Sequence, residues 1–195
     1  VMAPRTVGTL IGQWLIAVLI TRVDARHLIA LGAFMSATST WIMSGWSLDV
    51  SPWQVIWPAI LHGISGGFLW VCFNSLVVST LDARYREQGV PFYYLSFNVG
   101  FSFGVAGILA YWTISAQANY AILSEHLSPF NARIPREWDL SDPTVAAGFA
   151  NEIARQAGMV AFNNAFFVAT LAALLIIPIG YMFKNPGWRK GRRGG

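Results

Sequence analysis

Five long apolar stretches without any charged residue dominate the sequence. The 13 basic and 9 acidic side chains all lie between or beyond these stretches, which cover approximately residues 6–20, 28–45, 53–80, 90–114 and 159–183. A helix needs about 20 apolar residues to cross a hydrocarbon core about 30 Å thick. The last three stretches reach this length, and the first two are short but extend by a few residues into flanks that a membrane helix tolerates, such as Ala3 and His27. We therefore predict five transmembrane helices.

The composition supports an integral membrane protein. Of the 195 residues, 55% are hydrophobic and 11% are charged, whereas soluble domains carry about 25% charged residues. The mean hydropathy is +0.49, which excludes a disordered chain as well as a soluble domain. Cys72 is the only cysteine, which excludes a disulfide-stabilised secreted scaffold. The expected fold class is all-α, with helices that span a membrane.

The basic residues predict the orientation. If the C-terminus is cytoplasmic, the segments 21–27, 81–89 and 184–195 hold nine of the 13 basic residues, as the positive-inside rule expects. We interpret the basic tail as an anchor to anionic lipid rather than a nucleic-acid site. The N-terminus is then outside, and no signal peptide precedes it. With an odd number of helices, we expect the chain to be the C-terminal part of a longer protein.

The predicted organisation has four parts. Residues 1–114 form four transmembrane helices with short loops, 115–158 a long outer loop, 159–183 the last transmembrane helix, and 184–195 the cytoplasmic tail. In the loop, Ala118 and Ile122 continue the fourth helix outward. Asp142-Pro143 combines a capping residue with a first-turn proline and predicts a second helix that continues through Gly158 into the last span. The loop is too long for a passive connection; it either packs on the protein's own surface or serves as a docking surface or lid.

Glycines four residues apart recur in three of the apolar stretches. Such pairs place both glycines on one helix face and allow a neighbouring backbone to approach closely. We favour helix packing over ligand contact as their role. The pairs are Gly8 with Gly12, Gly63 with Gly67, and Gly100 with Gly104.

Polar and aromatic residues inside the spans are the candidates for a substrate cavity. His62 is the side chain well inside a span whose ordinary pKa, near 6.5, allows it to carry a proton near neutral pH. The alternative is a neutral histidine that hydrogen-bonds across a helix interface. The full set of cavity candidates is His62, Trp70, Asn74, Tyr94, Phe97, Asn98 and Phe101. The sequence contains no catalytic triad, metal-ligand cluster or phosphate-binding loop, so we expect neither an enzyme nor a bound metal or cofactor.

Several motifs resemble the C-terminal half of the major facilitator superfamily, and within it the 14-helix drug:proton antiporters of the EmrB/QacA type. Residues 20–26, with Arg22, Asp24 and Arg26, look like the short cytoplasmic-loop motif of the superfamily. Residues 98–104 resemble its Asn-x-Gly-x-Ser-x-Gly helix, and residues 125–131 look like the start of its long outer loop. The resemblance covers nearly the whole chain.

This resemblance implies the five-helix C-terminal bundle of a major facilitator fold. It also implies proton-coupled export of hydrophobic or amphipathic drugs across the bacterial inner membrane. The partners would be a small hydrophobic or amphipathic substrate, protons, the lipid bilayer, the N-terminal half of the same transporter and a periplasmic adaptor protein. In such a transporter, the arginines of the loop motif would latch one state by pairing with acidic residues.

The sequence also departs from the family pattern. Thr21 and Asn164 stand where aspartate is common, Ala59 and Phe97 where arginine is expected, and His62 replaces a usual glutamine. The proton-accepting carboxylates of such antiporters lie mostly in the N-terminal half. Two alternatives therefore remain open: a facilitator-fold metabolite transporter, and a membrane scaffold that does not transport.

Overall fold

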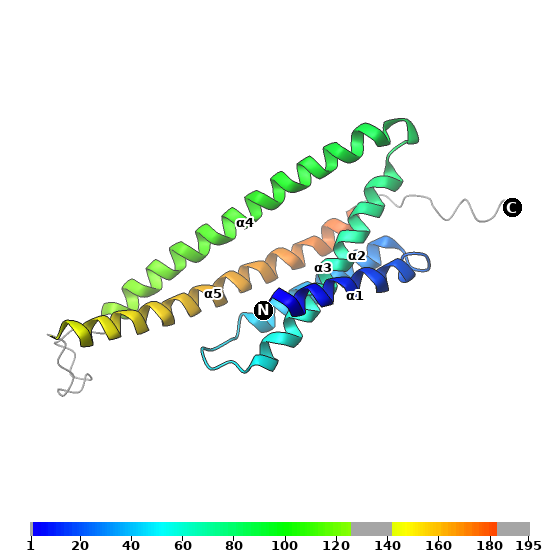
Figure 1. Ribbon diagram of the computed structural model, residues 1–195. Coiled ribbons are helices and arrows are strands. Elements are labelled where there is room, and N and C mark those ends of the chain that lie inside the picture. The colour runs from blue at the N-terminus through cyan, green and yellow to red at the C-terminus, as the bar shows by residue number, and fades with distance from the viewer. Residues whose placement is uncertain (1, 126–141, 183–195) are drawn as a thin grey trace.

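The computed structural model describes residues 2–125 and 142–182, and this part of the chain is helical (Figure 1). The helices are α1 (Met2–Leu19), α2 (Ala25–Met43), α3 (Pro52–Thr80), α4 (Arg86–Glu125) and α5 (Pro143–Met182), with a short 3-10 turn, η1 (Ala83–Tyr85), before α4. The all-helical fold class is confirmed for these residues. The predicted cytoplasmic tail, 184–195, and the middle of the predicted outer loop lie outside the described residues.

Three of the five helices are long and apolar enough to cross a membrane, namely α3, α4 and α5. By length and composition, the predicted spans are thus confirmed for these three helices. For α1 and α2, a membrane span stays a prediction. These two helices have 18 and 19 residues, and a helix of that length is about 27–29 Å long. They also carry polar residues, Arg5 and Gln13 in α1 and Arg26 in α2.

The core lies where α1, α2 and α3 meet. Each helix contributes apolar side chains that are almost completely buried: Ile16, Leu28, Ile29, Phe68, Cys72 and Leu76. Cys72 is fully buried in this cluster. Burial of large side chains from three helices makes this the part of the fold with the densest packing among the described residues.

Glycines on α1 and α3 bring the two backbones into direct contact. A Cβ atom on Gly67 would lie 2.6 Å from the Thr9 carbonyl oxygen, and one on Gly63 would overlap the Arg5 carbonyl oxygen. In the reverse direction, a Cβ atom on Gly8 or Gly12 would overlap a carbonyl oxygen of α3. Each glycine pair therefore accommodates the backbone of the other helix, which is the geometry that the spacing predicts.

Hydrogen bonds from polar side chains attach the second half of α5 to α2 and to the turn that follows α2. Thr170 donates to the Thr40 hydroxyl at 2.9 Å, in a buried contact, and the Asn163 amide donates to the Trp46 carbonyl oxygen at 2.8 Å. At the other end of the contact, His27 Nδ1 and the Tyr181 hydroxyl oxygen are 3.2 Å apart. Interhelical hydrogen bonds of this kind stabilise helix association in lipid, where the hydrophobic effect does not act between helices.

Helix α4 has no buried residue along its 40 residues. It meets α3 near its own start and approaches α5 towards its far end, where the Asn164 amide donates to the Ser115 hydroxyl at 3.2 Å (Figure 1). Between these contacts, residues 100–114 are all exposed. Gly100 and Gly104 have no described neighbour within 4 Å of a Cβ position, so a packing role for this pair stays a prediction.

Helices α4 and α5 extend far beyond the predicted membrane spans. Each has 40 residues, which corresponds to about 60 Å, twice the thickness of the hydrocarbon core. The two helices predicted within the outer loop are thereby confirmed: α4 continues to Glu125, and α5 begins at Pro143. Asp142 precedes α5 and accepts a hydrogen bond from the Thr144 N–H at 2.8 Å, which lowers the pKa of its carboxyl group.

The glycine contact can be tested within one helix, because α3 carries three glycines in a short stretch. We expect Gly63→Ala and Gly67→Ala to destabilise the protein by about 1–3 kcal/mol, since each new methyl group meets α1 backbone that has no rotamer to change. Gly66→Ala is the matched control, because no atom lies within 4 Å of its Cβ position. The measurement is thermal unfolding of the detergent-solubilised protein. Equal stability of all three variants would show that the close contact does not form.

Candidate functional site

Aromatic rings and two amides gather where α3 meets the beginning of α4. The Trp70 ring of α3 lies 5.3 Å from Phe97 in an edge-on arrangement and 6.3 Å from Tyr94. On α4, the Phe97 and Phe101 rings stack with their centres 6.3 Å apart. We call this group the aromatic–amide cluster; its members are Trp70, Asn74, Tyr93, Tyr94, Phe97, Asn98 and Phe101.

Hydrogen bonds fix the polar members of the cluster. The Tyr94 hydroxyl donates to the Asn74 side-chain oxygen at 2.7 Å and joins α4 to α3. The Asn74 amide in turn donates to the Trp70 carbonyl oxygen at 2.7 Å, and the Asn98 amide donates to the Tyr94 carbonyl oxygen at 2.8 Å. The Asn74 side chain thus uses both its donor and its acceptor, and these two hydrogen bonds hold it between the two helices.

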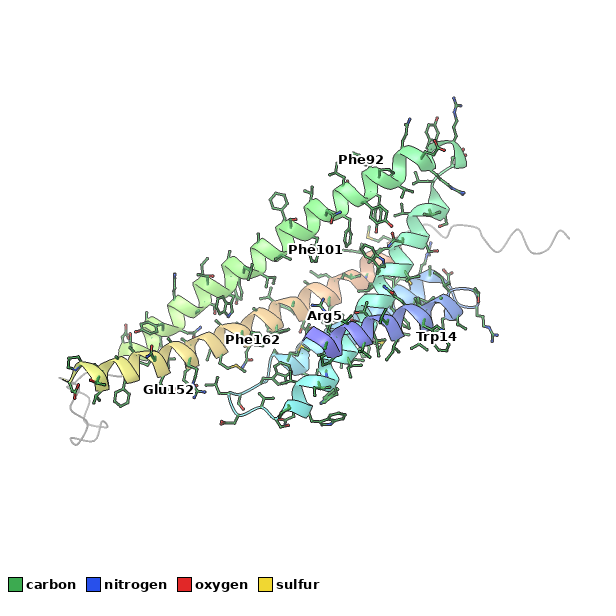
Figure 2. The ribbon with its side chains drawn as sticks, viewed as in Figure 1. Arg5, Trp14, Phe92, Phe101, Glu152 and Phe162 are labelled. Carbon is green, nitrogen blue, oxygen red and sulfur yellow. The ribbon has the colours of Figure 1, made fainter. Side chains whose placement is uncertain are left out.

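The rings of the cluster remain partly open although they touch one another. Trp70 is 41% exposed, Tyr94 38% and Phe101 63%. Figure 2 shows Phe101 on the side of α4 turned towards α3 and α5, whereas Phe92 lies on the opposite side. Partly open aromatic faces beside a few fixed polar groups form a wall suited to apolar and amphipathic molecules.

The structure brings together six of the seven cavity candidates predicted from the sequence. The exception is His62, which lies eight residues before Trp70 and has none of the cluster's ring contacts or side-chain hydrogen bonds. Tyr93 belongs to the cluster, since its ring lies 5.3 Å from Tyr94 and 6.2 Å from Phe97. Its spacing of four residues before Phe97 on one helix was the signal that could have identified it.

His62 lies instead on the part of α3 that packs against α1. Its side chain is half-buried, and its Nδ1 atom is buried without a hydrogen-bond partner among residues 2–125 and 142–182. The positive charge of Arg5 on α1 acts electrostatically on the ring. The hydroxyl of Ser65 donates to the His62 carbonyl oxygen at 2.7 Å and leaves the imidazole ring free. A hydrogen bond from Nδ1 across the helix interface is therefore not present in the described part.

The motif residues Arg22, Asp24 and Arg26 lie at the turn between α1 and α2. Asp24 directly precedes α2 but makes no side-chain cap, and the Arg26 Nε atom is buried without a partner in the described part of the chain. The ion pair found in the described residues joins Arg155 and Glu152 on α5 at 2.9 Å. The predicted pairing of the motif arginines with acidic residues thus stays a prediction. No group of three potential metal ligands occurs in the described ranges.

Comparison with known proteins gives one distant similarity. The chain is 20% identical over 172 residues to the fatty acid resistance protein FarB of Neisseria gonorrhoeae. The aligned region covers 85% of this chain and 34% of the relative, so the chain spans about a third of the relative's length. No family model matches the chain, and no solved structure matches it.

The hydrogen bond between Tyr94 and Asn74 generates a testable consequence. Tyr94→Phe removes one hydroxyl and leaves the Asn74 oxygen without its donor from α4, which should cost about 1 kcal/mol of stability. The matched control is Tyr111→Phe, because Tyr111 lies on the same helix, is 40% exposed and makes no hydrogen bond through its hydroxyl to any described residue. Thermal unfolding in detergent measures both variants. An equal, negligible change in both would contradict the role of this bond in joining α3 to α4.

Proposed function

We propose that the chain is the C-terminal part of a secondary active transporter of the major facilitator type that exports hydrophobic or amphipathic compounds. The observation that carries this proposal is the aromatic–amide cluster at the junction of α3 and α4. We further propose proton coupling and a location in the bacterial inner membrane, with the C-terminus in the cytoplasm.

The cluster suits a substrate that reaches its site through the membrane. An amphipathic molecule already dissolves in the bilayer, so its binding depends on shape and aromatic contact more than on many polar bonds. Trp70, Phe97 and Phe101 offer ring faces and edges for this contact. Asn74 and Tyr94 offer one polar position between the helices, which would orient a substrate without demanding a particular head group.

The similarity to a fatty acid resistance protein supports this substrate class. A fatty acid is an amphipathic molecule with a long hydrocarbon chain. Resistance to it is therefore compatible with a transporter whose substrate site is lined by aromatic rings. Long-chain fatty acids are therefore the first substrates to test, beside hydrophobic drugs.

Transport requires a second bundle, because an alternating-access carrier holds its substrate between two bundles that move against each other. The exposed middle of α4, with Gly100 and Gly104 on it, supplies an apolar face that such a bundle would cover. Proton entry drives substrate exit if protonation and substrate favour opposite-facing states. The carboxylates for proton uptake would then lie in the N-terminal half.

The long extension of α4 and α5 supports the docking interpretation of the outer loop. Two helices of about 60 Å exceed what the bilayer requires, so their far ends project from the membrane as a helical hairpin. We propose a periplasmic adaptor protein as its partner.

Loss of the Trp70 ring tests the proposed substrate wall. The transporter that contains this chain is expressed in a susceptible bacterial strain, and the minimal inhibitory concentrations of long-chain fatty acids and hydrophobic drugs are measured. Trp70→Ala should lower resistance about tenfold or more at unchanged membrane abundance, since loss of a ring contact removes more than 1 kcal/mol of binding.

Trp14→Ala is the matched control for this experiment. Trp14 is 70% exposed and lies on the side of α1 away from α4 (Figure 2), so its loss should leave resistance unchanged. Full resistance in the Trp70→Ala strain would remove the aromatic–amide cluster from the substrate path.

The proposed orientation is tested by cysteine labelling of intact cells. Cys72→Ala, combined with replacement of any cysteine in the rest of the transporter, provides a background without thiols, since a small apolar residue suits this fully buried position. In that background, Ala147→Cys on the outer hairpin should react with an impermeant thiol reagent in intact cells. Arg84→Cys, in the turn η1, should react only after the cells are opened. The reverse pattern would place the C-terminus outside.

A further inference from the structure

The aromatic–amide cluster lies in stretches of α3 and α4 that carry no charge. Residues 53–80 and 90–114 contain no Asp, Glu, Lys or Arg. Within residues 2–125 and 142–182, no hydrogen bond or ion pair joins a member of the cluster to a charged side chain. A charged head group bound there would lose its hydration without gaining a partner of opposite charge from these residues.

The charged side chains of the elements that pack against α4 lie away from the cluster. These elements are α3, η1 and α5. Glu87 is 11 residues before Asn98, about 16 Å along α4. The charged pair of α5 lies beyond the level of Ser115, which is 17 residues after Asn98, about 25 Å. The ionisable and charged residues concerned are His62 on α3, Asp82, Arg84, Arg86 and Glu87 at the turn, Glu125 at the end of α4, and Glu152 with Arg155 on α5.

Asn98 is the amide of the cluster with hydrogen-bonding groups to spare. One of its N–H groups donates to the Tyr94 carbonyl oxygen at 2.8 Å, whereas its second N–H and its Oδ1 atom make no hydrogen bond to a described residue. Asn98 follows Tyr94 by four residues and precedes Phe101 by three, so it lies beside both on the helix surface. The Asn74 side chain, in contrast, is engaged with Tyr94 and Trp70.

The free donor and acceptor of Asn98 match an uncharged carboxyl group. A protonated carboxylic acid has one O–H donor and one carbonyl acceptor, so it can donate to Oδ1 and accept from the free N–H at the same time. A primary amide offers the same pair of groups. An ionised carboxylate has acceptors only, and it would place a negative charge next to Oδ1. Desolvation in an apolar site also disfavours the ionised form.

We propose that the aromatic–amide cluster binds its substrate with an uncharged head group on the Asn98 amide and the hydrocarbon chain against the rings of Trp70, Phe97 and Phe101. This inference rests on the proposed export function and specifies the substrate class as long-chain molecules whose uncharged head group both donates and accepts a hydrogen bond. A fatty acid is then bound in its protonated form. At neutral pH the acid takes this proton from water, so each molecule bound consumes one proton.

The test compares ligands that share a hydrocarbon chain and differ in head group. The complete transporter is purified into lipid nanodiscs, with empty nanodiscs as the blank. Calorimetry then measures the binding of a long-chain fatty acid, its primary amide, an alkane sulfonate and an alkyl trimethylammonium ion. We expect the acid and the amide to bind, and the permanently charged sulfonate and ammonium ion to bind at least about tenfold more weakly.

The pH dependence identifies the form of the acid that binds. An aliphatic carboxyl group has a pKa of about 4.3 in water, so its protonated fraction falls about tenfold for each pH unit above about pH 5.5. The affinity for the fatty acid should therefore fall by the same factor between about pH 5.5 and about pH 7.5, with uptake of one proton per acid bound. The affinity for the amide should stay constant, which controls for titration of the protein.

A pair of variants on α4 tests the role of Asn98. Asn98→Leu keeps the size of the side chain and removes both hydrogen bonds to the head group, so it should weaken binding of the acid and the amide about tenfold. Ser96→Leu is the matched control, because Ser96 is also exposed but lies on another face of the same helix. It should leave binding of both ligands unchanged. Thermal unfolding and membrane abundance show whether each variant is folded.

Other outcomes would overturn the proposal in distinguishable ways. An affinity for the fatty acid that does not change with pH, or equal binding of the sulfonate, would show that the site takes the anion. Equal binding by the Asn98→Leu and Ser96→Leu variants would remove Asn98 from the head-group site. Binding of the ammonium ion alone would refute an uncharged head group and leave the proposed export function standing. If the unmodified transporter bound none of the four ligands, the proposed function itself would fail.

Discussion

The direct backbone contact between α1 and α3 is the constraint on which the rest of the arrangement depends. Apolar side chains gain little by leaving lipid for one another, so helices in a membrane associate through close packing and polar contacts. The interlocked glycines of α1 and α3 supply that packing. They fix the level of α1 against α3 and leave the other faces of α3 to α2 and α4.

Helices α4 and α5 are attached to this centre in different ways. Hydrogen bonds from Asn163, Thr170 and Tyr181 distribute the contact of α5 over its second half. Helix α4 instead contacts α3 at one end and α5 towards the other, and its middle is exposed. An apolar helix with an open middle has a large surface that only lipid or a further helix can cover, which is why we assign that face to the proposed second bundle.

The sequence predicted the positions of the helices well and their contacts only in part. Charge-free stretches located all five helices, because charged residues are excluded from the hydrocarbon core. Asp142-Pro143 marked the start of α5, because a capping side chain and a first-turn proline both act locally. The separation of His62 from Trp70 was not predictable, since periodicity shows which residues share a face but not which helix covers it. Likewise, the same glycine spacing packs against the α1 backbone at Gly63 but has no described neighbour at Gly100. The spacing alone therefore does not show whether a second helix is in contact.

Helix α3, which carries part of the aromatic–amide cluster, is held very differently on its two sides. On the α1 side the contact is between backbones, which cannot be displaced without breaking the glycine packing. On the α4 side it consists of ring contacts and the hydrogen bond between Tyr94 and Asn74, which side-chain rotations can break and re-form at little cost. A movement of α4 relative to α3 would therefore open or close the aromatic–amide cluster while the backbone packing of α1 on α3 stayed intact. In such a transporter α1 and α3 would move as one unit, and the aromatic wall beside them would change.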